Sequence, residues 1–455
     1  MQFPIFQVPH LGNGMTIALD AVLHMIISHG LAIGAIALII IGEYLGYRKS
    51  SKDWENFSKE FLKSTAIIIT GVGAVTGVGI WFTTSALSPR GIGSLLRIFF
   101  WPWFIEWIAF TLEVIVLLIY YFTWNRWTGE RKKQHIYLGL SYTFFALAST
   151  FLITGIIGFM LTPDGWPWNK SFWSAFFNPS LLPQLLLRIS GGFALGAMFS
   201  AAFLLVTRRE YAFRKEALRV FGKFFSVSFF VAIIFSWWYF TVIPSTFKTH
   251  ALFSVLTSRF SQYPTVFYAM NAAGIFVLLL FALFSLRGSV FLSRVLIIPA
   301  LLFAIGFVTE FERVREFIRG PYLMPGYMYS NQILLKEGPF LNREGTLKSS
   351  YWYNMTANSP DIISQGAYLF AQNCSMCHTI GGINDIKERI KGRPEDGIFV
   401  ILGHIHEMIP FMPPFSGTDQ ERTIMARFLY QLSTGKFTLG APSRFTPIKR
   451  GEKHG

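Results

Sequence analysis

Residues 374–378 read Cys374-Ser375-Met376-Cys377-His378, and this string decides the fold of the C-terminal part of the chain. Two cysteines separated by two residues and followed at once by a histidine are typical of a c-type haem attachment site. The two thiols bond the vinyl groups along one edge of the porphyrin, and the histidine then lies under the iron as its proximal ligand. The string therefore predicts one covalently attached haem c.

The alternatives for this string are a redox-active thiol pair and a metal site. The chain has 2 cysteines in 455 residues, so no other thiol competes with Cys374 and Cys377. A redox pair does not need the following histidine, and a structural zinc site needs more ligands than this stretch offers. We therefore prefer the haem interpretation.

Residues 359–436 around the string are expected to form a small helical cytochrome c domain. Thr418 and, three residues later, Glu421 form a capping-box pattern that opens a final helix. Met412 precedes two prolines that stiffen its loop, and it is the preferred distal iron ligand. The competing ligands are Met408, His404 and His406.

The rest of the chain has the composition of a membrane protein, with 52% hydrophobic and 14% charged residues. About eight apolar stretches are long enough to cross a bilayer, at approximately residues 16–47, 61–87, 96–124, 136–161, 183–206, 219–243, 265–286 and 289–308. We therefore expect an all-α fold with four parts. They are a polytopic membrane helix bundle over residues 1–308, a connector over 309–358, the mono-haem cytochrome c domain over 359–436 and a basic tail over 437–455.

The positions of the positive charges predict the orientation in the membrane. The loops after spans one, three, five and seven carry most of the Lys and Arg near the span ends, among them Arg208, Arg209 and Arg214. Basic loops favour the cytoplasmic side, so both termini and the cytochrome c domain are expected in the periplasm, outside a bacterial inner membrane. The net charge of +15 is then a topology signal, and no nucleic-acid partner is expected. Residues 1–15 contain no Lys or Arg, so we expect no cleaved signal peptide.

Titratable side chains inside the spans are the candidate functional residues of the membrane part, because such groups are costly in lipid. Asp20 and His24 are four residues apart and share a helix face. His29 follows His24 by five residues, which in an α-helix directs the two rings to different neighbours, so that they could not ligate one haem. One is then a ligand, and the other is a hydrogen-bond partner or a ligand of a second haem. For either ring, the alternative is a hydrogen bond to a backbone carbonyl.

Glu106 and Glu113 lie two helical turns, or about 10 Å, apart on one stripe of span three. This spacing suggests a proton path or a carboxylate near a haem iron, and the alternative for Glu106 is an ion pair with Arg97 or Arg188. Met270 in span seven is a candidate soft axial ligand, although packing is the commoner role of such a residue.

Small residues recur in two spans and predict close helix contacts. Gly73 and Gly77 form one such face, and Gly192 and Gly196 form another. Plain helix packing is the commoner explanation, and close approach to a flat haem is the alternative. His135, at the start of span four, is expected at the membrane interface, and a haem contact is the alternative.

Residues 17–24, 73–77, 105–113 and 134–135 resemble the corresponding stretches of subunit I of the cytochrome bd-type oxidases. The resemblance implies that His24 is an axial ligand of a high-spin haem and that Glu106 and Glu113 serve haem ligation and proton delivery. It also makes Met270 similar to a methionine ligand of the family. Residues 366–430 resemble class I mono-haem cytochromes c.

The chain departs from the bd-type pattern at several positions. Leu187 and Arg188 stand where the family has a histidine ligand, and residues 289–308 contain no glutamate where the family has a ligand. The quinol-binding loop is reduced to about residues 244–264, and the last span is replaced by the cytochrome c domain. The low-spin haem and the quinol site of the family thus lack their usual residues.

The first functional hypothesis is a respiratory membrane oxidoreductase that moves electrons between haem c and one or more b-type or related membrane haems. It reduces oxygen if such a haem has an open coordination position, with Glu106 and Glu113 supplying protons. The expected partners are membrane lipid, periplasmic c-type cytochromes, an additional membrane subunit, and oxygen or quinone. The second hypothesis is a non-catalytic electron-transfer subunit that links quinone or a dehydrogenase to periplasmic cytochromes. A third is an anchor that holds haem c alone.

Overall fold

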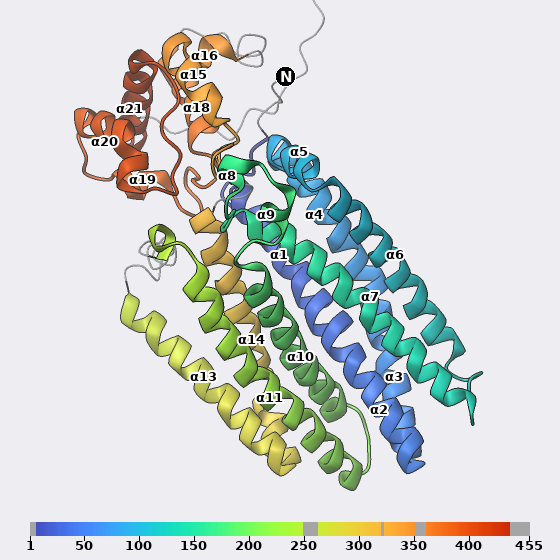
Figure 1. Ribbon diagram of the computed structural model, residues 1–455. Helices are drawn as coiled ribbons and strands as arrows, with labels where there is room; N and C mark the ends of the chain where they lie inside the picture. The colour runs from blue at the N-terminus through green and yellow to red at the C-terminus, as the bar shows by residue number, and fades with distance from the viewer. Residues whose placement is uncertain (1–5, 249–262, 320–322, 351–360, 437–455) are drawn as a thin grey trace, which may run out of the picture.

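The computed structural model describes residues 6–248, 263–319, 323–350 and 361–436. Within these ranges, 8 helical segments are long and apolar enough to cross a membrane, as the sequence predicts. They lie side by side in a bundle with a smaller helical domain at one end (Figure 1). The described residues contain isolated β-bridges but no strand, which confirms the all-α fold. The expected basic tail over 437–455 lies outside the described residues.

Spans one and two are continuous helices that change their winding midway. Span one consists of α1 (Asn13–Met25), the π-helix η1 (Ile26–Ala35) and α2 (Ile36–Lys49). Span two consists of α3 (Lys52–Ile68), the π-helix η2 (Ile69–Gly73) and α4 (Ala74–Leu87). A π-helix has i→i+5 hydrogen bonds, and such segments inside α-helices are frequent at functional sites.

The remaining spans are α6 (Phe100–Thr123), α7 (Arg131–Phe159), α10 (Leu181–Val206), α11 (Tyr211–Val242), α13 (Pro264–Arg287) and α14 (Val290–Arg319). The short helices α5 (Pro89–Ile98), α8 (Trp166–Asn169) and α9 (Phe172–Phe176) lie at the end near the smaller domain (Figure 1). Helix α14 continues past residue 308, where the sequence predicts the end of the last span. The first part of the expected connector is therefore a helical extension of span eight.

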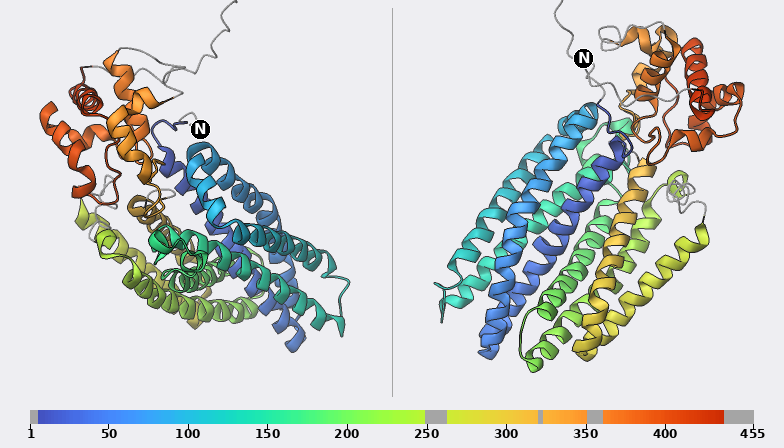
Figure 2. Two further views of the ribbon diagram at one scale, coloured as in Figure 1. Left: turned by 45° about the horizontal axis from the view of Figure 1, so that its top comes forward. Right: turned by 180° about the vertical axis from the view of Figure 1, so that it is seen from behind.

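The basic loops lie at the end of the bundle far from the smaller domain. The turns that join α2 to α3, α6 to α7, α10 to α11 and α13 to α14 all lie at that end (Figures 1 and 2). The predicted relation, with the cytochrome c domain opposite the basic loops, is thus the one observed. Which end faces the cytoplasm stays a prediction from the charges.

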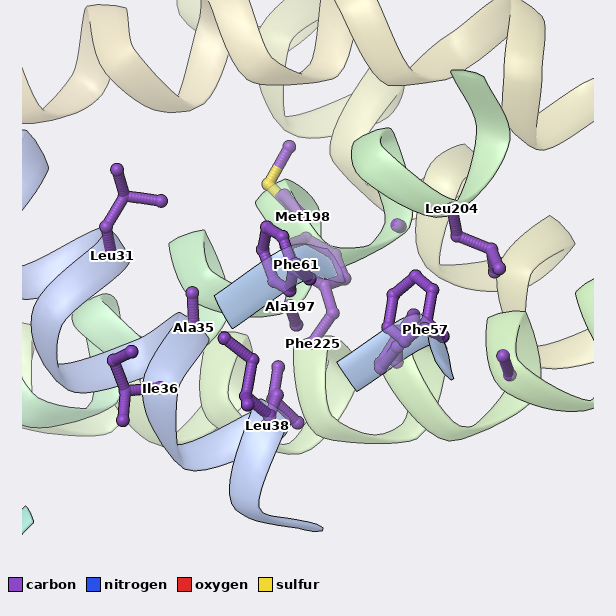
Figure 3. Close-up of a cluster of buried hydrophobic side chains, with 14 of the residues drawn as sticks. Leu31, Ala35, Ile36, Leu38, Phe57, Phe61, Ala197, Met198, Leu204 and Phe225 are labelled. Atoms are coloured by element: carbon purple, nitrogen blue, oxygen red, sulfur yellow. The ribbon is translucent and has the colours of Figure 1, made fainter. Parts of the chain in front are cut away.

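Span one makes its closest contact with α10. A Cβ at Gly34 would lie 2.1 Å from the backbone oxygen of Gly192, and one at Gly196 would lie 2.2 Å from the carbonyl carbon of Gly34. Glycine at these positions therefore lets the two backbones meet, which is the packing role expected of a small-residue face. The core beside this contact joins side chains of spans one and two, α10 and α11 (Figure 3). They include Leu31, Ala35, Ile36, Leu38, Phe57, Phe61, Ala197, Met198, Leu204 and Phe225.

The C-terminal domain packs two helices against each other around the attachment string. Its helices are η4 (Leu335–Glu337), α15 (Gly338–Glu344), α16 (Thr346–Ser349), α18 (Ile362–Asn373), α19 (Ile386–Ile390), α20 (Glu395–Met408) and α21 (Asp419–Ser433). Helices α18 and α21 meet where a Cβ at Gly366 would lie 2.3 Å from the Cβ of Phe428. The predicted capping box is confirmed, because Thr418 accepts from the Glu421 N–H and Glu421 accepts from the Thr418 N–H.

We predict that Gly196→Ala destabilises the bundle, whereas Gly191→Ala in the same helix does not. A methyl group at 196 collides with the backbone of span one, whereas nothing lies within 4 Å of a Cβ at 191. Overpacking costs about 1–3 kcal/mol, while an unobstructed Gly→Ala change in a helix gains roughly 0.5–1 kcal/mol. Thermal unfolding of both variants in detergent measures the difference. Equal midpoints would show that this backbone contact does not limit stability.

Candidate functional site

The attachment string forms a tight turn at the end of α18. The N–H groups of Cys377 and His378 both donate to the carbonyl of Cys374, at 3.2 and 2.9 Å. Asn384 supports this turn, since its side-chain amide donates to the carbonyl of Cys377 at 2.7 Å. Asn384 has a left-handed backbone with φ of 54°, which asparagine tolerates better than most residues. The side chain of Asn384 therefore stabilises this turn.

His378 is arranged as an iron ligand. Its Nδ1 lies 3.3 Å from the carbonyl oxygen of Asn384, and an N–H at that atom leaves the lone pair on Nε2. Burial, opposed by the hydrogen bond to Asn384, lowers the pKa of His378 to about 4, so the ring is neutral near pH 7. Burial likewise raises the pKa of the Cys374 thiol to about 12. Both cysteines are half-buried. These residues fit a covalently attached haem with a neutral imidazole ligand.

The loop after α20 separates Met412 from its competitors. The Met412 N–H donates to Ile409, and its carbonyl accepts from Nδ1 of His406 at 2.6 Å. His406 is thereby engaged as a support of the methionine loop. Met408 is 57% exposed, and Nδ1 of the exposed His404 lies 2.9 Å from Glu407. The surroundings therefore favour Met412 as the distal ligand, which stays a prediction.

A cavity of about 590 Å³ lies between the spans of the first half of the bundle. Its volume falls within the roughly 300–1,000 Å³ typical of cofactor sites. It brings together five residues that the sequence singles out from spans one, three and five. They are His24, His29, Glu106, Glu113 and Arg188.

His24 lies on the cavity wall against span two. Its Nδ1 is 3.2 Å from the carbonyl oxygen of Gly73 and 3.3 Å from Oγ1 of Thr76. A Cβ at Gly77 would lie 3.1 Å from Cε1 of the ring, so the small-residue face of span two makes room for the imidazole. With Nδ1 occupied, Nε2 is the nitrogen that could hold an iron. The donor, the cavity volume and the glycine face fit a haem.

His29 lines the same cavity but contacts different groups. Its Nε2 is 3.4 Å from Nη1 of Arg188, and its Nδ1 is 2.9 Å from Oγ of Ser28. The expected separation of neighbours is therefore observed, with His24 against span two and His29 against α10. In a regular α-helix, His24 and His29 would point in different directions, yet both line this cavity. His29 lies in the π-helix η1, and a π-helix brings residues five apart closer to one face.

Glu106 and Glu113 both bond to α7, as their common stripe implies. Oε1 of Glu106 accepts from Oγ of Ser149 at 2.8 Å, and Oε1 of Glu113 accepts from the Tyr142 hydroxyl at 2.9 Å. Glu113 is 9% exposed and Tyr142 is fully buried. The alternative ion pair of Glu106 with Arg188 is not found, because Arg188 faces Glu312.

Met270 is not brought to this cavity. It lies 47% exposed on α13, whereas the cavity is bounded by spans one to five and α14. Its expected role as an axial ligand thus lacks support, since α13 packs against α11 and α14 at the far side of the bundle. Packing or lipid contact is the role that its position favours.

The sequence reasoning missed charged residues on the last span. Helix α14 carries Glu312 and Arg315, which line the cavity and are 1% and 7% exposed. Glu312 pairs with Arg315 and lies 3.6 Å from Arg188. The i,i+3 spacing of Glu312 and Arg315 was the available signal, because it places both on one helix face. The continued helix therefore brings a carboxylate to the cavity, although residues 289–308 contain none.

His135 is also placed differently from the expectation of an interfacial residue. It is fully buried, with Nδ1 2.6 Å from Oε1 of Glu43 and Nε2 2.8 Å from the carbonyl of Tyr120. Glu43 also accepts from the Tyr120 hydroxyl at 2.6 Å and lies 2.8 Å from Nζ of Lys132. These four residues form a buried polar cluster at the basic end of the bundle.

We predict that Met412→Ala opens a coordination position on haem c, whereas Met408→Ala does not. The reduced Met412→Ala protein should bind carbon monoxide at haem c and show a lower haem c potential, because a Met ligand raises the potential. Optical spectra with and without carbon monoxide, together with a redox titration, measure both effects. A Met408→Ala protein that alone gained carbon monoxide binding would reverse the assignment.

We predict that His24→Ala loses non-covalent haem, whereas His29→Ala retains it. Of the two cavity histidines, His24 contacts other described groups through Nδ1, which leaves Nε2 available to iron, whereas His29 has contacts at both ring nitrogens. Pyridine haemochrome analysis, after acid-acetone extraction of the non-covalent haem, gives the ratio of that haem to haem c in each variant. Loss from His29→Ala with retention in His24→Ala would contradict the assignment.

Two family models match separate parts of the chain. The family model described as "Cytochrome bd terminal oxidase subunit I" matches residues 14–251. The model described as "Cytochrome C oxidase, cbb3-type, subunit III" matches residues 361–429.

Individual relatives match the membrane part of the chain. The "Putative cytochrome bd menaquinol oxidase subunit I" of Bacillus subtilis (strain 168) is 27% identical over 202 residues, or 41% of this chain. The match spans less than half of that relative, 44% of its length. The structure of bd oxidase from Geobacillus thermodenitrificans matches with a TM-score of 0.56 over 70% of this chain and 90% of that chain. At 18% identity, this likeness shows the fold alone.

Proposed function

Because this chain belongs to the cytochrome bd terminal oxidase subunit I family and ends in a cytochrome c domain, we propose that it reduces oxygen with electrons from periplasmic c-type cytochromes. Its coarser role is respiratory electron transfer in a bacterial membrane. The observation that carries the proposal is the cavity lined by His24, Glu106 and Glu113. A bound haem would supply a one-electron redox centre and, with an open coordination position, an oxygen-binding site.

In this proposal each residue of the chain has a defined task. His24 holds the membrane haem through Nε2, and Gly73 and Thr76 orient the ring through Nδ1. Glu106 and Glu113 hold exchangeable protons on the stripe that faces α7, where Ser149 and Tyr142 bind their carboxyl groups. Cys374, Cys377 and His378 hold haem c, with Met412 as its distal ligand. The basic loops at the opposite end of the bundle support a periplasmic position of the cytochrome c domain in this proposal.

A second function has its own support. Arg188 occupies the place of a histidine ligand in the bd-type pattern, and the Glu312 carboxylate faces two guanidinium groups. A chain with fewer membrane haems could act as an electron-transfer subunit without reducing oxygen, linking quinone or a dehydrogenase to periplasmic cytochromes. An open iron coordination position separates the two functions.

A membrane partner is part of either proposal. Large apolar side chains are exposed along α6 and α13, including Trp101, Trp107, Phe122 and Phe276. Lipid covers such faces, and a further membrane subunit would cover part of them.

We predict that the dithionite-reduced protein binds carbon monoxide at a membrane haem and consumes oxygen with reduced cytochrome c as donor. Glu113→Gln should slow this turnover by about tenfold or more, because positioned proton transfer typically contributes 10²–10⁴-fold. Glu130→Gln, an exposed change in a loop, serves as the matched control. Difference spectra and an oxygen electrode give the two readouts.

Two results would overturn the oxidase proposal. A membrane haem without carbon monoxide binding would favour the electron-transfer subunit. Turnover with quinol alone would exclude cytochrome c as the donor.

A further inference from the structure

We infer that residues 8–14 dock the haem c attachment loop onto the start of span one, so that electrons pass between haem c and the His24 site within one chain. This inference rests on the proposed function, because it requires a membrane haem at His24. Beyond the proposed function, the inference states where the cytochrome c domain docks and which residues hold it there. The N-terminal segment lies between the bundle and this domain (Figure 2).

Backbone hydrogen bonds join the two parts. The N–H of Gly14, in the first turn of α1, donates to the carbonyl of Met376 inside the attachment string at 3.0 Å. The N–H of Ile383 donates to the carbonyl of His10 at 2.6 Å, and Nδ1 of His10 lies 3.1 Å from the carbonyl of Gly381. The contacts thus flank His378 in the sequence, at Met376 before it and at Gly381 and Ile383 after it.

The fit between the two segments also depends on glycine. A Cβ at Gly382 would lie 2.1 Å from the carbonyl oxygen of His10, so no side chain fits there. Gly12 has φ of +83°, and a Cβ on it would lie 3.0 Å from Cγ2 of Thr379. Such close backbone approach marks a shaped interface and differs from the loose contact of a tethered domain.

Asn13 holds the N-terminal segment in the docking shape. The residue is 2% exposed. Its side-chain amide donates to the carbonyl of Phe6 at 2.7 Å, and its side-chain oxygen accepts from the N–H of Val8 at 3.0 Å. The segment therefore folds back on the first residue of α1. Both hydrogen bonds lie within the N-terminal segment and involve no atom of the haem c loop.

Span one then connects the two candidate iron ligands. Met376 lies two residues before His378, and its carbonyl accepts a hydrogen bond from the N–H of Gly14. His24 follows Gly14 by ten residues in the same helix. At 1.5 Å per residue the rise from Gly14 to His24 is about 15 Å. The transfer is one electron, which oxidises one haem iron by one unit and reduces the other by one, with no bond made or broken. A fixed docking keeps this separation constant.

The test compares full-length Gly382→Ala with Gly338→Ala, which adds a Cβ where nothing lies within 4 Å. Asn13→Ala is a second variant that weakens docking without altering the cytochrome c domain. Hydrogen exchange of peptides covering residues 8–16 and 379–386 reports docking without any haem activity. Photoreduction of haem c by a ruthenium complex, followed by the absorbance of the membrane haem, reports intramolecular transfer.

We expect faster exchange in both peptides and transfer slowed by about tenfold or more in Gly382→Ala and Asn13→Ala, because an undocked domain samples span one only through its tether. Gly338→Ala should match the parent protein, and haem c content should be equal in all four proteins. Unchanged transfer rates despite faster exchange, or unchanged exchange, would overturn the inference. A parent protein without a membrane haem would refute the proposed function instead, while the exchange data would still test the docking.

Discussion

Span one is held between α10 and span two by contacts that require glycine, and the membrane cavity depends on this arrangement. Gly34 meets Gly192 and Gly196 on one side, and Gly73 and Gly77 receive Ile27 and His24 on the other. Lipid tails are as apolar as leucine, so helices in a membrane associate through close packing and hydrogen bonds. The position of His24 is consequently set by backbone shape, and the site does not depend on a large side chain to hold it.

Two clusters of buried charged residues lie toward the two ends of the bundle, and the cavity lies near one of them. Arg188, Glu312 and Arg315 meet near the cytochrome c domain, whereas Glu43 and Lys132 meet near the basic loops. An ion in hydrocarbon is stable only when a partner accompanies it. Each cluster also ties distant spans together, since Arg188 and Glu312 belong to spans five and eight. Charge pairing thus closes a bundle whose interior contains a cavity.

The sequence predicts the features that depend on local spacing. Hydropathy finds the spans, the Cys-x-x-Cys-His string finds the cytochrome c domain, and the seven-residue spacing of Glu106 and Glu113 places both on the stripe of α6 that faces α7. It fails where the answer depends on which helices are neighbours. Met270 is a plausible ligand in sequence, but α13 lies away from the cavity. Likewise, His135 meets Glu43 only because spans one and four pack together.

The π-helical segments η1 and η2 change the direction in which side chains point along spans one and two. Each turn of π-helix takes up an extra residue, so positions before Ile26 and after Ala35 do not share the face that a regular helical wheel assigns to them. An alignment with relatives that lack this winding would need a gap inside span one, although no loop is present there. A helical wheel drawn with one regular period for the whole span would then assign either His24 or Gly34 to the wrong face. The insertion of a single residue in a membrane helix can therefore leave the fold intact while redirecting half of its side chains.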